Sequence, residues 1–466
     1  MSRPQIDARF HSPMKLRFRD DLMLTRFAGL KVLHALFAIL AFNRRLRHAL
    51  RPCKSGRYRL WRIIKLLIVM IMLGGHRLRH FESMRRDPML CRIIGVRQLP
   101  SVSTLSRYLS KAPQASATAL RALNRQIIED RLRSLHPKEL TVDFDGSVQS
   151  TRAHAEGVAV GFNKKKRVAY IYYPLYATLP ITGQFYDLLH RPGNAHDSRG
   201  AAAFALECFE RLGLVCSRSM LSARFDAAHF NLPTLIGLQD AGVKFTCSIP
   251  WRRYLKIKLH AQDLQGWISS PDYPFEYKVV EFVPDKWSDN PEAAPICKRW
   301  RTIVVRYLRD KPLKGPLQLE LFEPVSREYE YNAIVTNRGE GADRVVFFHR
   351  GRGNQEKILG EAKQDAALGV VMGRRRVANE LFTLCGMMAH NLGREWQLRT
   401  DRKPRNQGKN QGSVRRFESL GTLSRRFLQQ AGRIIKPQGR LVLEMNTDEG
   451  TRRRIERDLD RLQATY

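Results

Sequence analysis

Apolar residues recur at helical spacing through the first third of the chain. Stretches rich in Leu, Ile and Arg, such as Tyr58 to Leu73 and Thr118 to Leu135, show little of the alternation that strands require. The pattern predicts an all-α N-terminal domain over residues 1–136. Within it, a proline and several serines precede a short amphipathic helix at residues 100–111. This arrangement is typical of the second helix of a DNA-reading helix-turn-helix, and it also begins many ordinary helices.

The spacing of apolar residues changes to every second position at residues 139–145. This predicts a strand with one apolar face and one acidic face, and the acidic face carries Asp143 and Asp145. Strands and helices then alternate along the chain. The strands are predicted at 158–163, 168–176, 220–226 and 243–248, and the helices at 198–212 and 231–241. This order predicts an α/β layer architecture, so we assign residues 137–251 to the first part of a core.

Residues 252–348 interrupt the alternation with proline, tryptophan and β-prone segments, which predicts a β-rich insertion. Helical patterns resume at 354–368 and 376–392. We therefore assign residues 349–395 to the last part of the core. Residues 397–416 contain seven Lys or Arg and one acid. The remaining region, 396–466, is predicted to be a basic linker and a C-terminal tail, with the linker ordered by a phosphate backbone.

The charge balance narrows the class of partner. The chain has 81 Lys and Arg against 44 Asp and Glu, a formal net charge of +37, which favours nucleic acid. The 43% hydrophobic content is sufficient for packed cores. Seven cysteines without a CxxC pair favour a reducing cytoplasm over a disulfide framework or a zinc ribbon. The apolar runs Val32 to Phe42 and Ile63 to Leu73 fall short of the ~20 residues that a membrane span needs.

Two acidic positions are candidates for chemistry. Side chains two residues apart on a strand share a face, so Asp143 and Asp145 project together, and paired carboxylates repel unless a cation or a proton neutralises them. Mg²⁺ prefers such oxygen ligands, whereas the alternative is a solvated strand edge. Asp226 ends the strand at 220–226, where ligands gather in open α/β sheets. Its alternative role is a surface ion pair with Arg224.

A third candidate lies on the predicted helix at 354–368. Glu356 and Lys363 are seven residues apart, so they share one helix face and stand roughly 10 Å apart along the axis. A carboxylate for a metal ion and an ammonium for a DNA phosphate could line one groove there. The alternative is a pair of charges on a solvated helix face.

The spacing around the third candidate matches a known pattern. Three residues separate Arg352 from Glu356 and six separate Glu356 from Lys363, while His349 precedes Arg352 by three positions. This segment resembles the signature of DDE transposases of bacterial insertion sequences, in which a Tyr occupies the position of His349. Other segments between about residues 20 and 395 resemble, in order, the insertion-sequence group numbered thirteen-eighty. They include Gly74-Gly75-His76, Asp143-Phe144-Asp145-Gly146-Ser147, Arg191-Pro192-Gly193-Asn194 and Arg224-Phe225-Asp226.

The resemblance implies an α/β fold with a ribonuclease-H-like catalytic core and a β-rich insertion, preceded by the all-α domain. By matching position, it implies Asp145, Asp226 and Glu356 as metal-binding catalytic carboxylates, with Asp143 as the alternative first acid. It also implies two Mg²⁺ ions, which Mn²⁺ can replace, acting in cleavage and strand transfer by in-line attack on a phosphodiester.

The resemblance further implies partners and a location. The partners are double-stranded DNA at terminal inverted repeats and at a target, and a second copy of the chain in the synaptic complex; the location is the bacterial cytoplasm, at the nucleoid. The residues expected to contact phosphate are Arg352, Lys363, His349, Arg224 and Arg191. Two alternatives remain, a ribonuclease-H-type nuclease that cleaves without joining and a catalytically inactive DNA-binding protein derived from a transposase.

Overall fold

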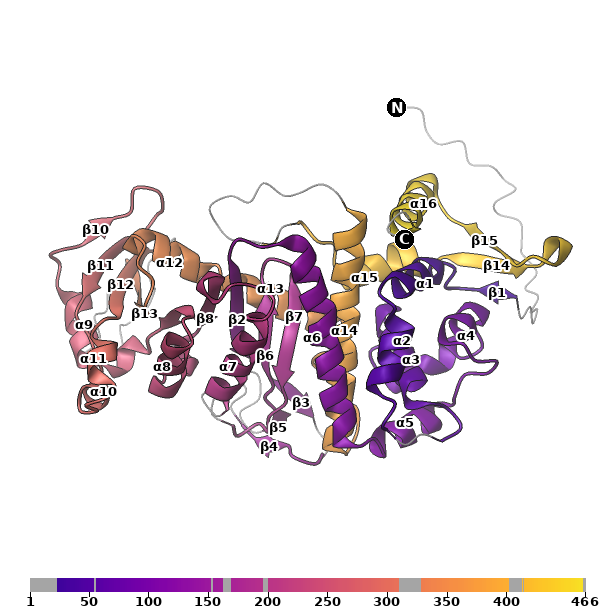
Figure 1. Ribbon diagram of the computed structural model, residues 1–466, viewed down its shortest axis with the longest axis horizontal. Helices are drawn as coiled ribbons and strands as arrows, with labels where there is room; N and C mark the ends of the chain where they lie inside the picture. The colour runs from indigo at the N-terminus through magenta and orange to yellow at the C-terminus, as the bar shows by residue number, and fades with distance from the viewer. Residues whose placement is uncertain are drawn as a thin grey trace, which may run out of the picture.

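The computed structural model has a mixed α/β architecture, with a helical part, a central layered part and a strand-rich part side by side (Figure 1). It describes residues 23–53, 56–151, 154–161, 169–195, 200–309, 328–401, 413 and 415–463. The strand-rich part and the central part share one large sheet.

The N-terminal part is mainly helical. It contains β1 (Leu24–Thr25), α1 (Leu30–Ile39), α2 (Phe42–Ala49), α3 (Leu60–Met72), the 3-10 helix η2 (Leu78–Met84), α4 (Pro88–Ile94), α5 (Val102–Ser110) and α6 (Gln114–Leu135). Local sequence explains the helix ends. Asp87 caps α4 by accepting hydrogen bonds from the amides of Met89 and Leu90, and Gly95 ends it with a φ of 76°. Ser101 caps α5, the helix expected at 100–111, by accepting from the Thr104 amide.

The C-terminal part packs on the N-terminal helices. Its elements are α14 (Arg376–Thr400), α15 (Leu420–Leu423), the π-helix η6 (Ser424–Leu428), β14 (Ala431–Ile435), η7 (Pro437–Gly439), β15 (Val442–Asn446) and α16 (Glu449–Gln463). Strands β1, β14 and β15 form an antiparallel sheet. One hydrophobic core joins Leu36 and Ile68 to Leu384 of α14 and Ile455 of α16. The N-terminal helices therefore do not close a core alone. Lys403, Arg405 and Lys409 of the predicted linker lie outside the described residues.

A mixed sheet of nine strands organises the rest, in the order β10-β11-β12-β13-β9-β8-β2-β6-β7. The strands are β2 (Leu140–Gly146), β6 (Leu175–Leu179), β7 (Gln184–Leu189), β8 (Leu221–Phe225), β9 (Lys244–Ser248), β10 (Ile268–Ser269), β11 (Glu276–Val280), β12 (Arg301–Leu308) and β13 (Tyr329–Thr336). Neighbours β2 and β8, and β8 and β9, are parallel. The strands at 252–348 thus extend the core sheet through β13 and β9.

Helices cover the sheet, and those on the apolar face of β2 bury its predicted hydrophobic stripe. They are α7 (Ala201–Leu212) and α8 (Leu232–Asp240), and the Phe144 ring contacts Phe204 and Phe209 of α7. On the opposite face lie α13 (Gly353–Asp365) and α14. The remaining helices are η3 (Arg218–Met220), η4 (Ala227–His229), η5 (Trp251–Arg253), α9 (Leu255–Gln262), α10 (Asp285–Ser288), α11 (Ala294–Cys297) and α12 (Ala342–Arg350).

Two regions differ from the sequence pattern. Strand β7 has no predicted counterpart, because its central Asp187 is buried and pairs with Arg121 of α6 at 2.7 Å. A separate three-stranded sheet holds β3 (Gln149–Thr151), β5 (Tyr170–Tyr172) and β4 (Ala159–Val160). Lys164, Lys165 and Lys166, between the strands predicted at 158–163 and 168–176, lie outside the described residues. Within the described ranges, no helix combines the length and the apolar character that crossing a membrane requires.

Candidate active site

Two parallel strands bring the first two acids to the same edge of the sheet. The register pairs Asp143 of β2 with Arg224 of β8, and Phe144 with Phe225. The next positions along both strands are Asp145 and Asp226. Because these strands run in the same direction, the two carboxylates lie beside each other at their carboxyl ends, where ligands gather in open α/β sheets.

Asp143 is used inside the protein. Its side chain is fully buried, and its two oxygens accept hydrogen bonds from Nε and Nη2 of Arg224 at 2.5 and 2.8 Å. The remaining Nη1 of Arg224 donates to the carbonyl of Phe348 at 2.8 Å. Arg224, expected to contact phosphate, is therefore a buried structural partner with 1% of its side chain exposed. A bidentate pair of this kind satisfies both charges in place.

Asp145, one step closer to the edge, lacks such compensation. Its nearest cationic group is Nη1 of Arg352, 3.5 Å from Oδ2, and 18% of its side chain is exposed. Burial and the negative charge of Asp226 raise the pKa of Asp145 to about 6, although Arg352 opposes the shift. The carboxyl of Asp145 is thus held in a position where a cation would stabilise its charged form.

Asp226 is held in its charged form by the turn that follows β8. Its carboxylate caps η4 by accepting from the amide of Ala228 at 3.1 Å, and Oδ1 lies 2.7 Å from Nδ1 of His229. Burial alone would raise the pKa of Asp226, but the hydrogen bond from His229 and the amide contact hold this pKa below its ordinary value. His229 was not among the residues expected at the site. Its position three residues after an acidic cap is the only sequence signal for it.

Glu356 reaches the same edge from the first turn of α13. Its Oε1 lies 3.6 Å from Nη2 of Arg352, so one guanidinium lies between Glu356 and Asp145. The side chain of Glu356 is 67% exposed. Gln355 fixes the start of this helix, because its amide donates to the carbonyl of Asp143 at 3.0 Å. A side chain at Gly351 would meet Nη1 of Arg224 at 2.1 Å, so only glycine fits there.

Two other residues expected to contact phosphate, Lys363 and Arg191, differ in exposure. Lys363 is exposed on the last turn of α13. Arg191 is buried, with Nε donating to the carbonyl of Tyr173 at 3.1 Å and its guanidinium over the ring of Tyr173.

His349 is buried in the interior. Its Nε2 lies 2.8 Å from Oγ of Ser248 and its Nδ1 lies 2.9 Å from Oγ1 of Thr246. Burial and the nearby charges of Arg352 and Arg224 lower the pKa of His349 to about 3, so the ring is neutral. In this position His349 cannot donate to a DNA phosphate, because both ring nitrogens are engaged within the fold.

The donor set fits a divalent cation through its two adjacent carboxylates. Asp145 and Asp226 supply oxygen ligands, and the guanidinium of Arg352 already lies between Asp145 and Glu356 as a positive group. Among the described residues no group of three or more His, Cys, Asp or Glu is close enough to hold a metal ion, so Glu356 does not complete a three-carboxylate set with Asp145 and Asp226 here. Arg352 contacts both Glu356 and Asp145, so it links the first turn of α13 to the end of β2.

Comparisons with known proteins identify the family. No curated protein matches this sequence. Six solved chains match; one is the cryo-EM structure of a piggyBac transposase synaptic complex with hairpin DNA, 10% identical over 79% of this chain and 76% of that chain, with a TM-score of 0.36. The family model described as "Transposase DDE domain group 1" matches residues 7–466. Because this match spans nearly the whole sequence, the chain belongs to the group 1 DDE transposases.

Proposed function

We propose that this transposase binds terminal inverted repeats and catalyses metal-dependent DNA cleavage and strand transfer, with Asp145, Asp226 and Glu356 as its catalytic carboxylates. One observation carries the proposal: Asp145 and Asp226 end adjacent parallel strands, and Arg352 connects Asp145 to Glu356 on α13. Along the chain, two acids at strand ends are followed by one acid on a helix, and the family resemblance implies the same order. We assign β2, β8 and α13 to a ribonuclease-H-like core on this basis.

Asp145 is the better first acid than Asp143. The carboxylate of Asp143 is saturated by Arg224 and fully buried, so it has no oxygen to offer a ligand at the edge. Asp145 has a carboxylate at the edge beside Asp226, and its raised pKa reflects a charge that the protein leaves poorly stabilised. We therefore assign the catalytic role to Asp145 and a positioning role to Asp143.

The cofactor that fits these oxygen ligands is Mg²⁺, with Mn²⁺ as a substitute. Asp145 and Asp226 would hold it, with Glu356 as the third carboxylate. When bound there, a pair of such ions would supply the activation of a water or a DNA 3′-hydroxyl and the stabilisation of the leaving 3′-oxygen of the phosphodiester. His229 orients Asp226 and keeps it ionised, so that residue is ready to bind a cation. Arg352 and the exposed Lys363 would neutralise phosphate along the face of α13.

The partners follow from the same assignment. The net charge of +37 suits double-stranded DNA, both the terminal repeats and the target. We assign repeat binding to the N-terminal helices, including α5, and to the basic insertion. Bringing two element ends together requires a second copy of the chain, so a homodimer in the synaptic complex and a cytoplasmic location at the nucleoid belong to the proposal.

A cleavage and joining assay tests the proposal. The substrate is DNA carrying the inverted repeats that flank the reading frame, and the protein is supplied with Mg²⁺ or with EDTA. We expect Asp226→Ala to abolish both cleavage and joining while DNA binding persists. Asp240→Ala is the matched control, because Asp240 is an exposed acid at the end of nearby α8. It should react like the wild type.

The other outcomes of this assay contradict the proposal. Cleavage without joining would identify a ribonuclease-H-type nuclease. DNA binding without cleavage by the wild type would identify an inactive DNA-binding protein.

A further inference from the structure

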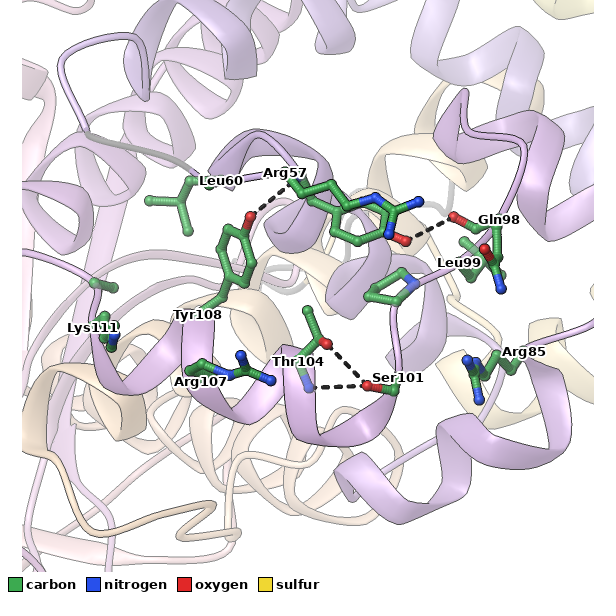
Figure 2. Close-up of a pocket in the computed structure, with 14 residues that line it drawn as sticks. Arg57, Leu60, Arg85, Gln98, Leu99, Ser101, Thr104, Arg107, Tyr108 and Lys111 are labelled. Carbon is green, nitrogen blue, oxygen red and sulfur yellow. Dashed lines mark hydrogen bonds between the residues drawn. The ribbon is translucent and has the colours of Figure 1, made fainter.

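A cationic pocket opens beside the first turn of α5, in the helical N-terminal part and among elements separate from the carboxylates. Its volume is about 680 Å³, within the range of small-molecule sites. Four cations line it: Arg57, Arg85, Arg107 and Lys111. Figure 2 shows Arg107 beside Thr104 on one side of the pocket and Arg57 on the opposite side. No Asp or Glu is among the described residues that line this pocket, so its field is positive.

Hydrogen bonds between distant segments fix the walls. The amide of Tyr58 donates to the hydroxyl of Tyr108 at 2.7 Å, and the hydroxyl of Tyr58 donates to the carbonyl of Gln98 at 3.2 Å. Both bonds are drawn in Figure 2. A side chain at Gly56 would meet the Tyr108 hydroxyl at 2.8 Å, so the chain can approach this ring only because Gly56 has none. The pocket is therefore formed before any ligand arrives.

The floor of the pocket is apolar and aromatic. Leu60, Leu99 and Pro100 are buried beneath it, and the rings of Tyr58 and Tyr108 are half-buried at its sides. Arg57 lies 6.0 Å from the ring of Tyr58, close enough for a cation–π contact. A ligand with a phosphate and an attached ring would match both the cations and this surface.

The exposed faces of α5 continue the positive surface. Thr104, Arg107 and Lys111 follow at helical spacing along the pocket. Ser103, Ser106 and Ser110 form the neighbouring exposed stripe. Small hydroxyl side chains let a helix approach a nucleic acid backbone closely and donate hydrogen bonds to it. Arg85 also pairs with Glu82 at 3.3 Å, but this ion pair is partly exposed and Glu82 does not line the pocket.

We propose that this pocket holds one nucleotide unit of the DNA backbone, with its phosphate on Arg107 and its sugar against Tyr58 and Pro100. The inference rests on the proposed function, because it takes the transposase's DNA as the ligand. It goes further by naming a phosphate-binding pocket that anchors the strand running past α5. A pocket of this kind gives affinity and register without reading sequence.

Binding of a fluorescent duplex of mixed sequence, followed by anisotropy in EDTA over a series of KCl concentrations, tests this pocket. We expect Arg107→Ala to weaken binding about tenfold and to reduce the slope of log K against log salt by about 0.9, the contribution of one phosphate contact. Arg92→Ala is the matched control, since Arg92 is exposed on neighbouring α4 and lies outside the pocket. This control should leave both quantities close to the wild type.

A second variant separates the pocket from general charge. Thr104→Trp keeps every cation and fills the pocket, so it should also weaken binding about tenfold, with circular dichroism confirming that it folds. If the wild type, Arg107→Ala and Thr104→Trp bound DNA with equal affinity and equal salt dependence, the proposed binding of DNA in this pocket would be wrong. Competition at equal strength by a free nucleoside monophosphate would overturn the assignment to backbone DNA. EDTA keeps this test independent of the carboxylates: a wild type that binds through the pocket but never cleaves contradicts only the proposed function.

Discussion

Asp143 and Asp145 lie two residues apart on the same face of β2, yet their surroundings differ completely. Asp143, one step inside the sheet, is buried and paired with Arg224 at 2.5 Å. Asp145, at the edge, has Arg352 at 3.5 Å and Asp226 beside it. We call Asp143, Arg224 and His349 the inner layer and Asp145, Asp226, Arg352 and Glu356 the outer layer. The inner layer satisfies its charges internally, whereas the outer layer leaves carboxylates that a cation would stabilise.

The largest expected effect concerns the inner layer. Asp143→Asn leaves Arg224 as a buried, uncompensated charge, so the free energy of unfolding should fall by about 3–5 kcal/mol. Urea denaturation followed by circular dichroism measures this change. The double variant Asp143→Asn with Arg224→Met should recover part of the loss, because it removes the stranded charge. A single variant as stable as the wild type would place Asp143 with the outer layer.

The equivalent change in the outer layer should have the opposite sign. A pKa that rises from 3.8 in the unfolded chain to about 6 at Asp145 means that ionisation opposes folding by up to about 3 kcal/mol. The contribution of the protonated Asp145 carboxyl to stability is complete below its unfolded pKa and is lost as the pH rises through about 6. In EDTA at neutral pH, Asp145→Asn should therefore be more stable than the wild type in urea denaturation, and the two should converge in acid. A variant less stable than the wild type at neutral pH would contradict this.

A smaller effect concerns the neutral histidine of the inner layer. Burial lowers the pKa of His349 to about 3, so its contribution to stability is complete above its unfolded value and is lost as the pH falls. When the pH falls from about 7 to about 5, this residue should lower the free energy of unfolding of the wild type by about 2 kcal/mol. His349→Gln should lose about 2 kcal/mol less stability than the wild type over that interval. His190 and His390, whose pKa values are also lowered by burial, lose stability equally in both proteins. Parallel pH profiles for the two proteins would show that His349 is solvated.

The smallest effect compares the two arginines. Arg352→Lys should change the free energy of unfolding by less than about 1 kcal/mol, because its ion pairs are long and partly exposed. Arg224→Lys should cost several times more, because a lysine cannot reproduce the bidentate contact with Asp143. Both values come from the same urea series. Equal losses would mean that the two layers are held together in the same way.

Much of the secondary structure was predictable because it depends on local spacing. The strand expected at 139–145 corresponds to β2 (Leu140–Gly146), and the helix expected at 231–241 to α8 (Leu232–Asp240). Membership of the DDE transposases was predictable from the residues around Arg352, and the family match confirms it. The strand β7 was missed, since its buried Asp187 is compatible with a strand only once Arg121 of α6 pairs with it.

The amino-acid sequence was sufficient to predict the periodicities and the spacing of Arg352, Glu356 and Lys363, because side-chain direction along a strand or helix follows from backbone geometry alone. It favoured Asp145 over Asp143 only through the family resemblance, and it grouped Arg224 and His349 with the phosphate contacts. Only the tertiary structure separated them. The register of β2 against β8 joins residues 81 positions apart, and α13 covers one acid and leaves the next at the edge. Burial then set which charges had to be paired inside the protein and which were left beside solvent.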